Sequence, residues 1–360
     1  MMLVEANLPE CPTRNLCKEP RTTITQLWHH KKEFLQAERM DENSPLHIVT
    51  PLIPSVTLSR LCGRQVFYSA ARKLPAIGSF KIRGIGNLVQ KSKERGCKQV
   101  VSSSGGNAGM ASAYVAKMLG LPATIVIPES TPKLMISRLE EEEAKVMVHG
   151  RIWNLAHEKA LEIAATGNSC LVHPYDHEEI WEGHSTIVTE VLQQTKAKPA
   201  AIVLSVGGGG LLCGVLKGLH KHDVDIPVVA METQGAHAFN AALKAGKPVS
   251  IGDITSIAKT LGALMVTEGI FDLMPGLRVT SHVISDKEAV EACSRFADEQ
   301  RMLVEPSCGA ALAAGYSGII KELISNNTLP DEGPIVFVVC GGNAVTLDML
   351  EGWKKQVNLL

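Results

Sequence analysis

The sequence has no excess of charge of either sign and no long apolar run. Its 36 basic and 37 acidic residues leave a formal net charge of -1, so we expect neither a nucleic-acid partner nor binding to acidic lipids. The longest apolar runs, residues 200–205 and 335–340, are of strand length and far too short to span a bilayer. The first ten residues lack a basic segment followed by an apolar one, which argues against a secretory signal and favours a cytoplasmic location.

Cysteine pairs with the spacing of metal or redox sites are also missing. The nine cysteines are an odd number and include no Cys-x-x-Cys pair, which argues against a disulfide framework or a zinc knuckle. We expect most of them to be reduced and buried. His173, His177 and His184 offer one spacing that suggests a metal site, but Pro174 interrupts any shared helical face.

The sequence does contain a regular alternation of helical and strand-like segments. Residues 1–45 are polar, contain several prolines and are expected to form a flexible N-terminal extension. The segments that follow predict helices at 55–61, 85–95, 105–118, 136–143, 153–165, 211–220 and 236–245, and strands at 65–68, 99–102, 123–128, 145–148, 200–205, 227–231 and 335–340. This β-α-β rhythm predicts parallel strands in two α/β lobes that flank a site.

A short glycine-flanked segment, Gly-Ser-Phe-Lys-Ile-Arg-Gly at residues 78–84, carries one ammonium group at Lys81. Phe80 places an aromatic ring beside that amine, and Gly78 and Gly84 let the backbone turn on either side. Partial desolvation lowers the pKa of a lysine and frees its nucleophilic amine, as a lysine that forms a Schiff base requires. On these residues alone, an ordinary solvated lysine at a helix start is the alternative.

Three glycine-rich turns each follow an apolar strand, and backbone N–H groups at such turns favour anions. The first, Ser-Ser-Gly-Gly-Asn-Ala-Gly at residues 103–109, offers the Ser104 hydroxyl and the Asn107 amide as a cradle for a carboxylate. Either side chain could instead cap the following helix. The third turn, Cys-Gly-Gly-Asn, begins with Cys340, which alone would be interpreted as a core cysteine.

The second turn is a run of four glycines, Gly207, Gly208, Gly209 and Gly210. Each glycine costs roughly 0.5–1 kcal/mol relative to alanine, and a closely approaching phosphate would justify that cost. No Gly-Lys-Ser or Gly-Lys-Thr follows, which excludes a Walker loop. A dinucleotide site would use an acid such as Glu232, at the end of the next strand. Its Gly-x-Gly-x-x-Gly spacing fails, because the third glycine would fall on Leu212 or Cys213.

Taken together, the lysine segment, the turn at 103–109, the four glycines and the Cys-Gly-Gly-Asn end resemble the pyridoxal-phosphate β-elimination family, and within it the L-serine dehydratase group. The likeness covers about residues 45–346. It includes Ala-Met-Glu-Thr-x-Gly-Ala-His at 230–237 and Leu-Val-Glu-Pro-Ser-Cys-Gly-Ala-Ala-Leu-Ala-Ala at 303–314.

The resemblance implies an α/β fold of two domains, the pyridoxal-phosphate fold type II, with parallel-rich twisted sheets flanked by helices. Residues 78–176 would form a small domain, and residues 46–77 with 177–360 a large cofactor-binding domain. The resemblance also implies a homodimer that acts on a small amino-acid substrate.

The resemblance further implies a role for each motif. Lys81 would bind pyridoxal 5'-phosphate and act as the catalytic residue, with Phe80 and Thr260 against the two faces of the cofactor ring. Cys340 would face the pyridine nitrogen, and Asn107 would hydrogen-bond the ring hydroxyl.

The remaining roles concern the substrate, the phosphate and a cation. Ser104, Gly105 and Asn107 would bind the substrate carboxylate, and the four glycines would bind the phosphate. A monovalent cation, for which K+ is the candidate, would bind at the positions Gly207, Glu232, Ala236, Leu261 and Ala263.

The sequence departs from the family pattern in the approach to the lysine. Ser-Ala-Ala-Arg-Lys-Leu-Pro at residues 69–75 replaces a segment resembling Lys-x-Glu-Asn-x-Gln-Pro, and Ile77 looks inserted. Such a change could misplace Lys81, and small misplacements cost on the order of a hundredfold in rate. Thr260 stands where the family has a small residue, and at Asn343-Ala344 the family often has two polar residues.

The activity implied by the resemblance is elimination from β-hydroxy amino acids. L-Serine would give pyruvate and ammonia, and L-threonine would give 2-oxobutanoate and ammonia, with the amine of Lys81 as general base. The alternatives are a serine racemase or threonine deaminase of the same fold, whose families have serine in place of Cys340. A pyridoxal-phosphate-binding protein with little activity is a third reading.

Overall fold

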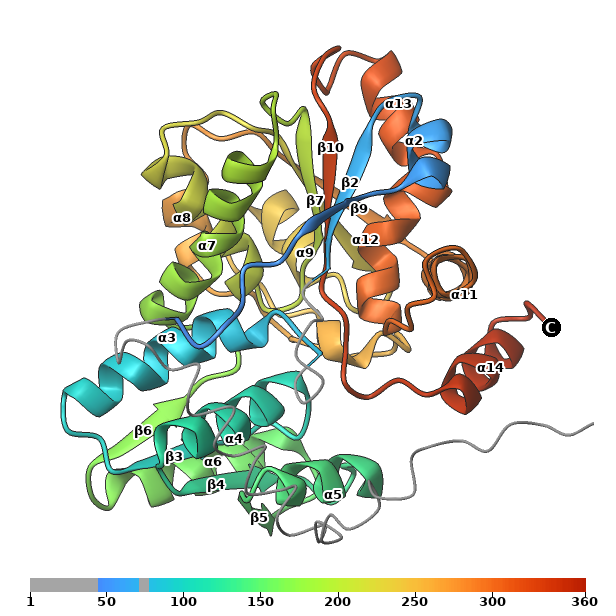
Figure 1. Cartoon of the computed structure of the whole chain (residues 1–360). Helices are drawn as coiled ribbons and strands as arrows, with labels where there is room; N and C mark the ends of the chain where they lie inside the picture. Colours follow the sequence, from blue (N-terminus) through green and yellow to red (C-terminus); the bar gives the residue numbers. More distant parts are fainter. Residues whose placement is uncertain (1–44, 71–77) are drawn as a thin grey trace, which may run out of the picture. The chain divides into compact units, whose positions relative to one another are not determined.

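The computed structural model describes residues 45–70 and 78–360, and this part of the chain is built around two β-sheets (Figure 1). Most of the expected extension at 1–45 and of the altered segment at 69–77 therefore lies outside the described residues. A six-stranded sheet has the order β1-β2-β10-β7-β8-β9, and a four-stranded sheet has the order β5-β4-β3-β6. Neighbouring strands are parallel throughout, except that β1 runs antiparallel to β2.

The strands of the six-stranded sheet are short and apolar. They are β1 (Leu52–Pro54), β2 (Val66–Ala70), β7 (Ala201–Ser205), β8 (Val228–Thr233), β9 (Val279–Ile284) and β10 (Ile335–Val339). The three central strands β7, β8 and β10 are buried along their whole length, as expected for parallel strands covered by helices on both faces.

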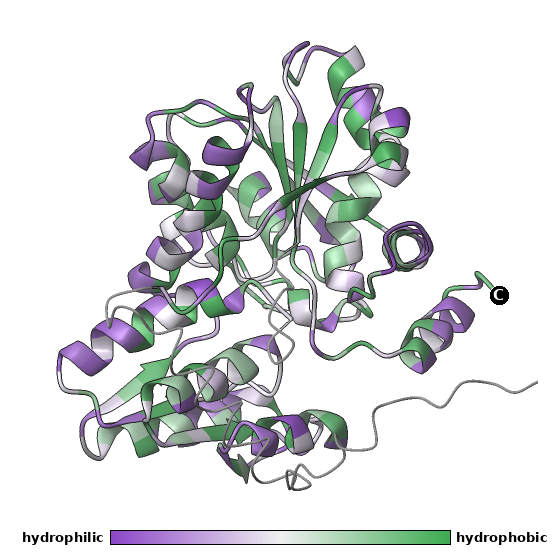
Figure 2. Ribbon diagram, in the orientation of Figure 1, coloured by the Kyte–Doolittle hydropathy of each residue, from purple (hydrophilic) through white to green (hydrophobic). Residues whose placement is uncertain are grey.

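Two apolar cores lie on opposite faces of this sheet because successive side chains of a strand alternate between the faces. Val203 and Phe337 belong to one core, and Leu204 and Val338 to the other. The first core is completed by α2 (Val56–Cys62), α11 (Asp286–Gln300), α12 (Pro306–Tyr316), α13 (Ile319–Ser325) and α14 (Leu347–Gln356). The second is completed by α7 (Glu178–Gln194), α8 (Gly210–Lys221), α9 (Ala238–Ala245) and α10 (Gly269–Leu273). Figure 2 shows the central strands coloured hydrophobic and polar residues on the helices around them.

The four-stranded sheet also has helices on both faces. Its strands are β3 (Gln99–Ser102), β4 (Ala123–Ile127), β5 (Lys145–Val148) and β6 (Ser169–Val172). One face packs on α3 (Lys81–Glu94), α4 (Asn107–Leu119) and α5 (Lys133–Glu141). On the other face, Val101 and Val126 pack against Ala156 and Ala160 of α6 (Trp153–Ala165).

Helix α3 connects the two sheets by crossing α7 at very short range. A β-carbon at Gly183 would lie 2.2 Å from the Arg83 carbonyl oxygen, and one at Gly84 would lie 2.6 Å from the Ile180 carbonyl oxygen. At the same crossing Arg83 is 2% exposed, and its guanidinium donates to both oxygens of Glu190 at 2.6 and 2.7 Å. The position of α3 relative to the large sheet is thereby fixed.

The expected α/β class with parallel-rich sheets is confirmed, and most predicted elements are present. The helix expected from residue 85 begins at Lys81, because Gly84 lies inside the helix and does not interrupt it. The sequence reading assigned no element to α7 or to α11, α12 and α13. Helix α12 is buried on all sides, so it lacks the polar face that identifies a helix from its periodicity. Among the described helices, none has the length and apolar character needed to cross a membrane.

We predict that Gly183→Ala lowers the thermal unfolding midpoint, since the added carbon would collide with the backbone of α3. Overpacking of this kind costs about 1–3 kcal/mol. The matched control is Gly352→Ala in α14, where the new carbon meets nothing within 4 Å and replacing a helical glycine stabilises by about 1 kcal/mol. Equal midpoints for the two variants would contradict the close crossing of α3 and α7.

Candidate active site

The start of α3 is fixed to the end of β10 on the large sheet. Ser79 pairs with Gly341 in an isolated antiparallel bridge, and the Gly342 N–H donates to the Gly78 carbonyl at 2.9 Å. Lys81 is the first residue of α3, with Phe80 preceding it at the N-cap position. The lysine and the turn that begins at residue 340 are therefore held next to each other.

The amine of Lys81 is partly buried, which excludes the ordinary solvated lysine considered above. Its Nζ donates to the Pro174 carbonyl and lies 5.2 Å from the centre of the Phe80 ring. Burial lowers the pKa of Lys81 to about 8, although the nearby Cys340 thiol acts in the opposite direction. A substantial fraction of the amine is therefore neutral and nucleophilic near pH 8.

Cys340 directly follows β10 and faces the same region. Its Sγ lies 3.7 Å from the Ser205 hydroxyl at the end of β7 and 3.7 Å from the Val338 carbonyl. Burial raises the pKa of the Cys340 thiol to about 11. The thiol is consequently neutral and can offer a weak hydrogen bond but no charge.

The four glycines form the turn between β7 and α8, and packing against neighbouring residues explains much of their lack of side chains. A β-carbon at Gly208 or Gly210 would lie 2.4 Å from Tyr175, and one at Gly207 would lie 3.1 Å from Leu261. Gly209 has φ +98° and would meet Ile270 at 2.4 Å. The four glycines are thus required in part by close contacts with neighbouring residues, and not only by a bound phosphate.

The same turn nevertheless has the chemistry of an anion site. Gly208, Gly209 and Gly210 are buried, and none of their N–H groups donates a hydrogen bond to another residue that the structure describes. Buried N–H groups without partners are costly, and here they lie at the start of the 12-residue helix α8. A phosphate group would satisfy them and would meet the favourable end of the helix dipole.

The turn at residues 103–109 leads from β3 into α4. Gly106 takes the N-cap position without a side-chain bond, so neither Ser104 nor Asn107 caps the helix. The Ser104 hydroxyl accepts from the Gly106 N–H at 3.3 Å, and a β-carbon at Gly105 would lie 2.8 Å from Thr131. Gly109 permits the turn, since its β-carbon would lie 1.7 Å from the Ser104 carbonyl oxygen.

Asn107 points across to elements of the large sheet. Its Oδ1 accepts from the Asn343 N–H at 3.0 Å, and its Nδ2 lies 3.2 Å from Oε2 of Glu305. Thr260 reaches the same carboxylate, with Oγ1 2.7 Å from Oε2. Glu305 was missed as a site residue in the sequence reading, although it lies within the motif at 303–314. An acid directly before a helix-starting proline was the available signal.

The five positions expected to bind a cation lie on three neighbouring segments. Leu261 and Ala263 lie in and after the short 3₁₀ helix Lys259–Leu261, and Leu261 packs against Gly207. Ala236 follows β8. Glu232 is fully buried, and its two carboxylate oxygens accept from the Phe239 and Asn240 N–H groups at 2.8 and 2.7 Å. Burial raises the pKa of Glu232 to about 7, which a bound cation would lower.

The three histidines singled out in the sequence have separate surroundings. His173 Nδ1 accepts from the Asp176 N–H at 2.8 Å, and His177 Nδ1 accepts from the Glu179 N–H at the start of α7. His184 lies fully buried against Phe80, with ring centres 4.9 Å apart. Within the described ranges 45–70 and 78–360, no group of three His, Cys, Asp or Glu residues could hold a metal ion. The seven cysteines in these ranges are free thiols.

The four-glycine turn, the turn at 103–109 and Cys340 directly follow parallel strands, at the edge where α/β proteins bind ligands. The bridge between Ser79 and Gly341 holds the start of α3, and with it Lys81, next to the turn after β10. A partly neutral lysine amine beside a cradle of unpartnered N–H groups fits an aldehyde cofactor that carries a phosphate. Fold and site together define a pyridoxal-phosphate enzyme of fold type II.

Comparison with known proteins agrees with this class. The family model described as "Pyridoxal-phosphate dependent enzyme" matches residues 44–341, and the chain belongs to that family. It is 48% identical over 316 residues to "Serine dehydratase-like" of Rattus norvegicus, covering 87% of this chain and 96% of that protein. It is 46% identical over 323 residues to "L-serine dehydratase/L-threonine deaminase" of Homo sapiens, covering 89% and 98%. The crystal structure of a fungal L-serine ammonia-lyase from Rhizomucor miehei superposes with a TM-score of 0.81 at 35% identity, covering 87% of this chain and 100% of that chain.

We predict that the Lys81 amine reacts with an acylating reagent at half its maximal rate near pH 8, because burial lowers its pKa to about 8. The measurement is mass-spectrometric quantification of the labelled peptide in cofactor-free protein across a pH series. In denaturant the same peptide should titrate near the value of a free lysine, about 10.4. A folded-state midpoint at that higher value would show that the amine is not desolvated.

Proposed function

We propose that this chain is a pyridoxal-phosphate-dependent ammonia-lyase that converts L-serine to pyruvate and ammonia, and L-threonine to 2-oxobutanoate and ammonia. The observation that carries the proposal is the partly neutral amine of Lys81 next to the neutral thiol of Cys340. The name of the human relative, L-serine dehydratase/L-threonine deaminase, supports the choice of substrates.

Each part of the site has a distinct task in this proposal. Lys81 holds the cofactor, and the N–H groups of residues 207–210 bind its phosphate. Phe80 and Thr260 lie against the two faces of its ring. Asn107 donates to the ring oxygen, and Ser104 and Gly105 bind the substrate carboxylate. Residues 78–176 would act as the small domain, and residues 46–77 with 177–360 as the large one.

Pyridoxal phosphate, when bound, stabilises negative charge at the substrate Cα. The neutral Nζ of Lys81 is the group that can accept the Cα proton, because it is a base with a pKa near the working pH. The Cys340 thiol is uncharged, so it would give the pyridine nitrogen of the bound cofactor no anionic partner, which would favour loss of the β-hydroxyl over return of the proton.

The resemblance to the L-serine dehydratase group also supports a homodimer that works in the cytoplasm and binds K+. The cation would bind near Glu232, the buried carboxylate whose pKa burial raises to about 7. Serine racemase and threonine deaminase remain the alternatives of the same fold, and a cofactor-binding protein with little turnover is the alternative suggested by the altered segment at 69–77.

We predict that the cofactor-loaded protein forms pyruvate from L-serine, measured in an assay coupled to lactate dehydrogenase, and forms 2-oxobutanoate from L-threonine. D-Serine should give no product. Lys81→Ala should abolish both activities, and borohydride reduction of the wild type should attach the cofactor to the peptide that contains Lys81.

The control for this experiment is Lys98→Ala, which removes an exposed lysine outside the site. Equal turnover of both serine enantiomers would favour a racemase. Silence with every substrate despite bound cofactor would favour a protein with little activity, and undiminished turnover by Lys81→Ala would contradict the assignment of the lysine.

We predict that K+ stabilises the protein at pH 7 more than at pH 5, relative to the larger tetramethylammonium ion. Without a small cation, the raised pKa of Glu232 means that the folded state holds a proton that the unfolded chain has lost, so stability falls as the pH rises from about 4.3 to about 7. A bound cation removes this penalty and adds its own binding free energy. Thermal unfolding midpoints measure both effects, and identical midpoints in the two salts at pH 7 would contradict the cation site.

A further inference from the structure

Glu305 is a buried carboxylate that neutral donors surround. It is 4% exposed and immediately precedes α12. It makes no ion pair with any Lys, Arg or His that the structure describes. Its oxygens accept from Asn107 Nδ2 at 3.2 and 3.3 Å, from Thr260 Oγ1 at 2.7 Å and from the Ala344 N–H at 3.1 Å. Burial raises the pKa of Glu305, while these hydrogen bonds favour its charged form.

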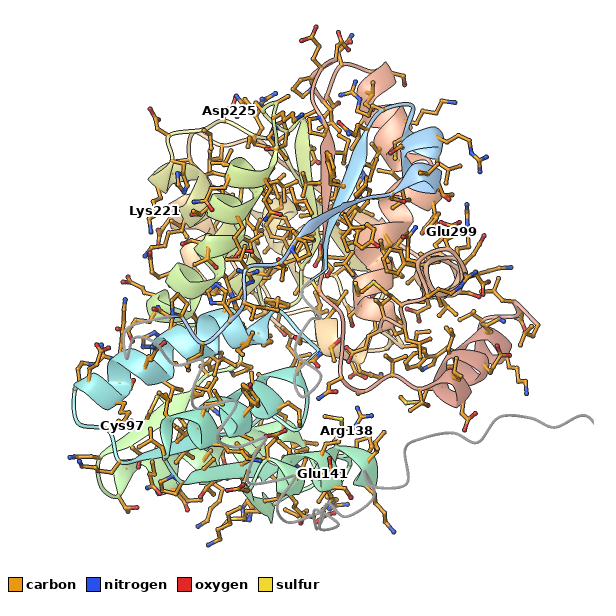
Figure 3. The ribbon with its side chains drawn as sticks, viewed as in Figure 1. Cys97, Arg138, Glu141, Lys221, Asp225 and Glu299 are labelled. Carbon is orange, nitrogen blue, oxygen red and sulfur yellow. The ribbon has the colours of Figure 1, made fainter. Side chains whose placement is uncertain are left out.

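The donors come from parts of the chain that are far apart in sequence. Asn107 begins α4 beside the four-stranded sheet, Thr260 lies in the 3₁₀ helix, and Ala344 lies in the loop that follows β10. That loop approaches the carboxylate closely, since a β-carbon at Gly342 would lie 2.2 Å from the Glu305 side chain. The loop is also held from α5, where Arg138 donates to Asn343 Oδ1 at 3.3 Å; Figure 3 labels Arg138.

These contacts determine which way the Asn107 amide faces. A backbone N–H only donates hydrogen bonds, so the amide oxygen must face the Asn343 N–H, and the amide nitrogen then faces Glu305. The contacts of the Asn107 nitrogen with the two Glu305 oxygens, at 3.2 and 3.3 Å, share one of its two hydrogens, because both oxygens lie in nearly the same direction. The other hydrogen is left for a ligand. Asn107 therefore presents a donor, and the ligand atom that it meets has to be an acceptor.

We propose that Glu305 is a positioning residue: its carboxylate holds Asn107, Thr260 and the loop at residues 341–344 together across the junction of the two sheets, and orients Asn107 as a donor toward the cofactor. Only the orientation of Asn107 toward the cofactor rests on the proposed function. The holding of the loop is a property of the cofactor-free protein and can be tested without any cofactor.

An apolar side chain would serve packing at lower cost, because a buried carboxylate without a cation loses its hydration. A carboxylate at residue 305 is explained if it has to hold its hydrogen-bond partners in fixed positions. Hydrogen bonds to a charged acceptor are roughly twice as strong as neutral ones, so a single carboxylate can order three separate segments at once.

The test uses Glu305→Ala and Glu305→Gln in the full chain, with Asp286→Asn as the matched control. Asp286 also accepts from neutral donors, the Ser256 hydroxyl and the Ile257 N–H, but both lie near residue 260 on the large-sheet side. The first measurement is hydrogen–deuterium exchange of the peptide covering residues 341–346 in cofactor-free protein. The second is the dissociation constant of pyridoxal phosphate, measured by the change in its absorbance.

In Glu305→Ala we expect the hydrogen–deuterium exchange rate of the Ala344 amide to rise about tenfold or more. The dissociation constant of pyridoxal phosphate should rise by a similar factor, because the hydrogen bonds to the carboxylate are lost. Glu305→Gln keeps the volume and one acceptor oxygen, so its losses should be smaller and in the same direction. The Asp286→Asn control should leave both quantities at their wild-type values.

Unchanged exchange at residues 341–346 in Glu305→Ala overturns the proposal, whether or not the protein binds the cofactor. If Glu305→Ala does not fold, unchanged exchange and affinity in Glu305→Gln overturn it instead. A wild-type protein that binds no pyridoxal phosphate refutes the proposed function. In that case the hydrogen–deuterium exchange measurement still shows whether Glu305 holds the loop at residues 341–344.

Discussion

The buried ion pair between Arg83 and Glu190 fixes the helix on which the site depends. Arg83 lies two residues after Lys81, and both of its terminal nitrogens are bound to the Glu190 carboxylate. Removing one partner of such a pair typically costs about 3–5 kcal/mol, because the other charge is left buried alone. The glycines at the crossing of α3 and α7 allow the helices to come close enough for this pair to form. The reactive amine is therefore placed by contacts on the far side of its own helix.

Burial sets the chemical state of the groups around that amine. It lowers the pKa of Lys81 and raises those of Cys340 and Glu232, because a low-dielectric surrounding disfavours the charged form of each. In this way the same desolvation gives a neutral base, a neutral thiol and a carboxylate that favours a counter-ion. Burial also raises the pKa of Glu305, and in both carboxylates neutral hydrogen-bond donors offset part of that cost.

Much of the fold and of the candidate site could be predicted from the sequence, because strand and turn signals are local. The lysine segment and the three glycine turns are continuous in sequence, and each of the three turns lies where a strand ends. The sequence did not reveal Glu305 or the crossing of α3 and α7, because both depend on residues about 100 to 200 positions apart. Helix α12 was missed because it is buried all round. The reason for glycine at 208 and 210 lies in Tyr175, which only the tertiary structure brings near.

The contact between Tyr175 and the glycine turn also makes the residues acceptable at position 208 depend on the residue at position 175. The aromatic ring occupies the volume that a side chain at residue 208 would need, and the Tyr175 backbone does the same for residue 210. A larger residue at 208 can enter only in a lineage that has already exchanged the tyrosine for something smaller. The substitution at residue 175 consequently has to come first, and residues 175 and 208 should covary as the lineage diverges.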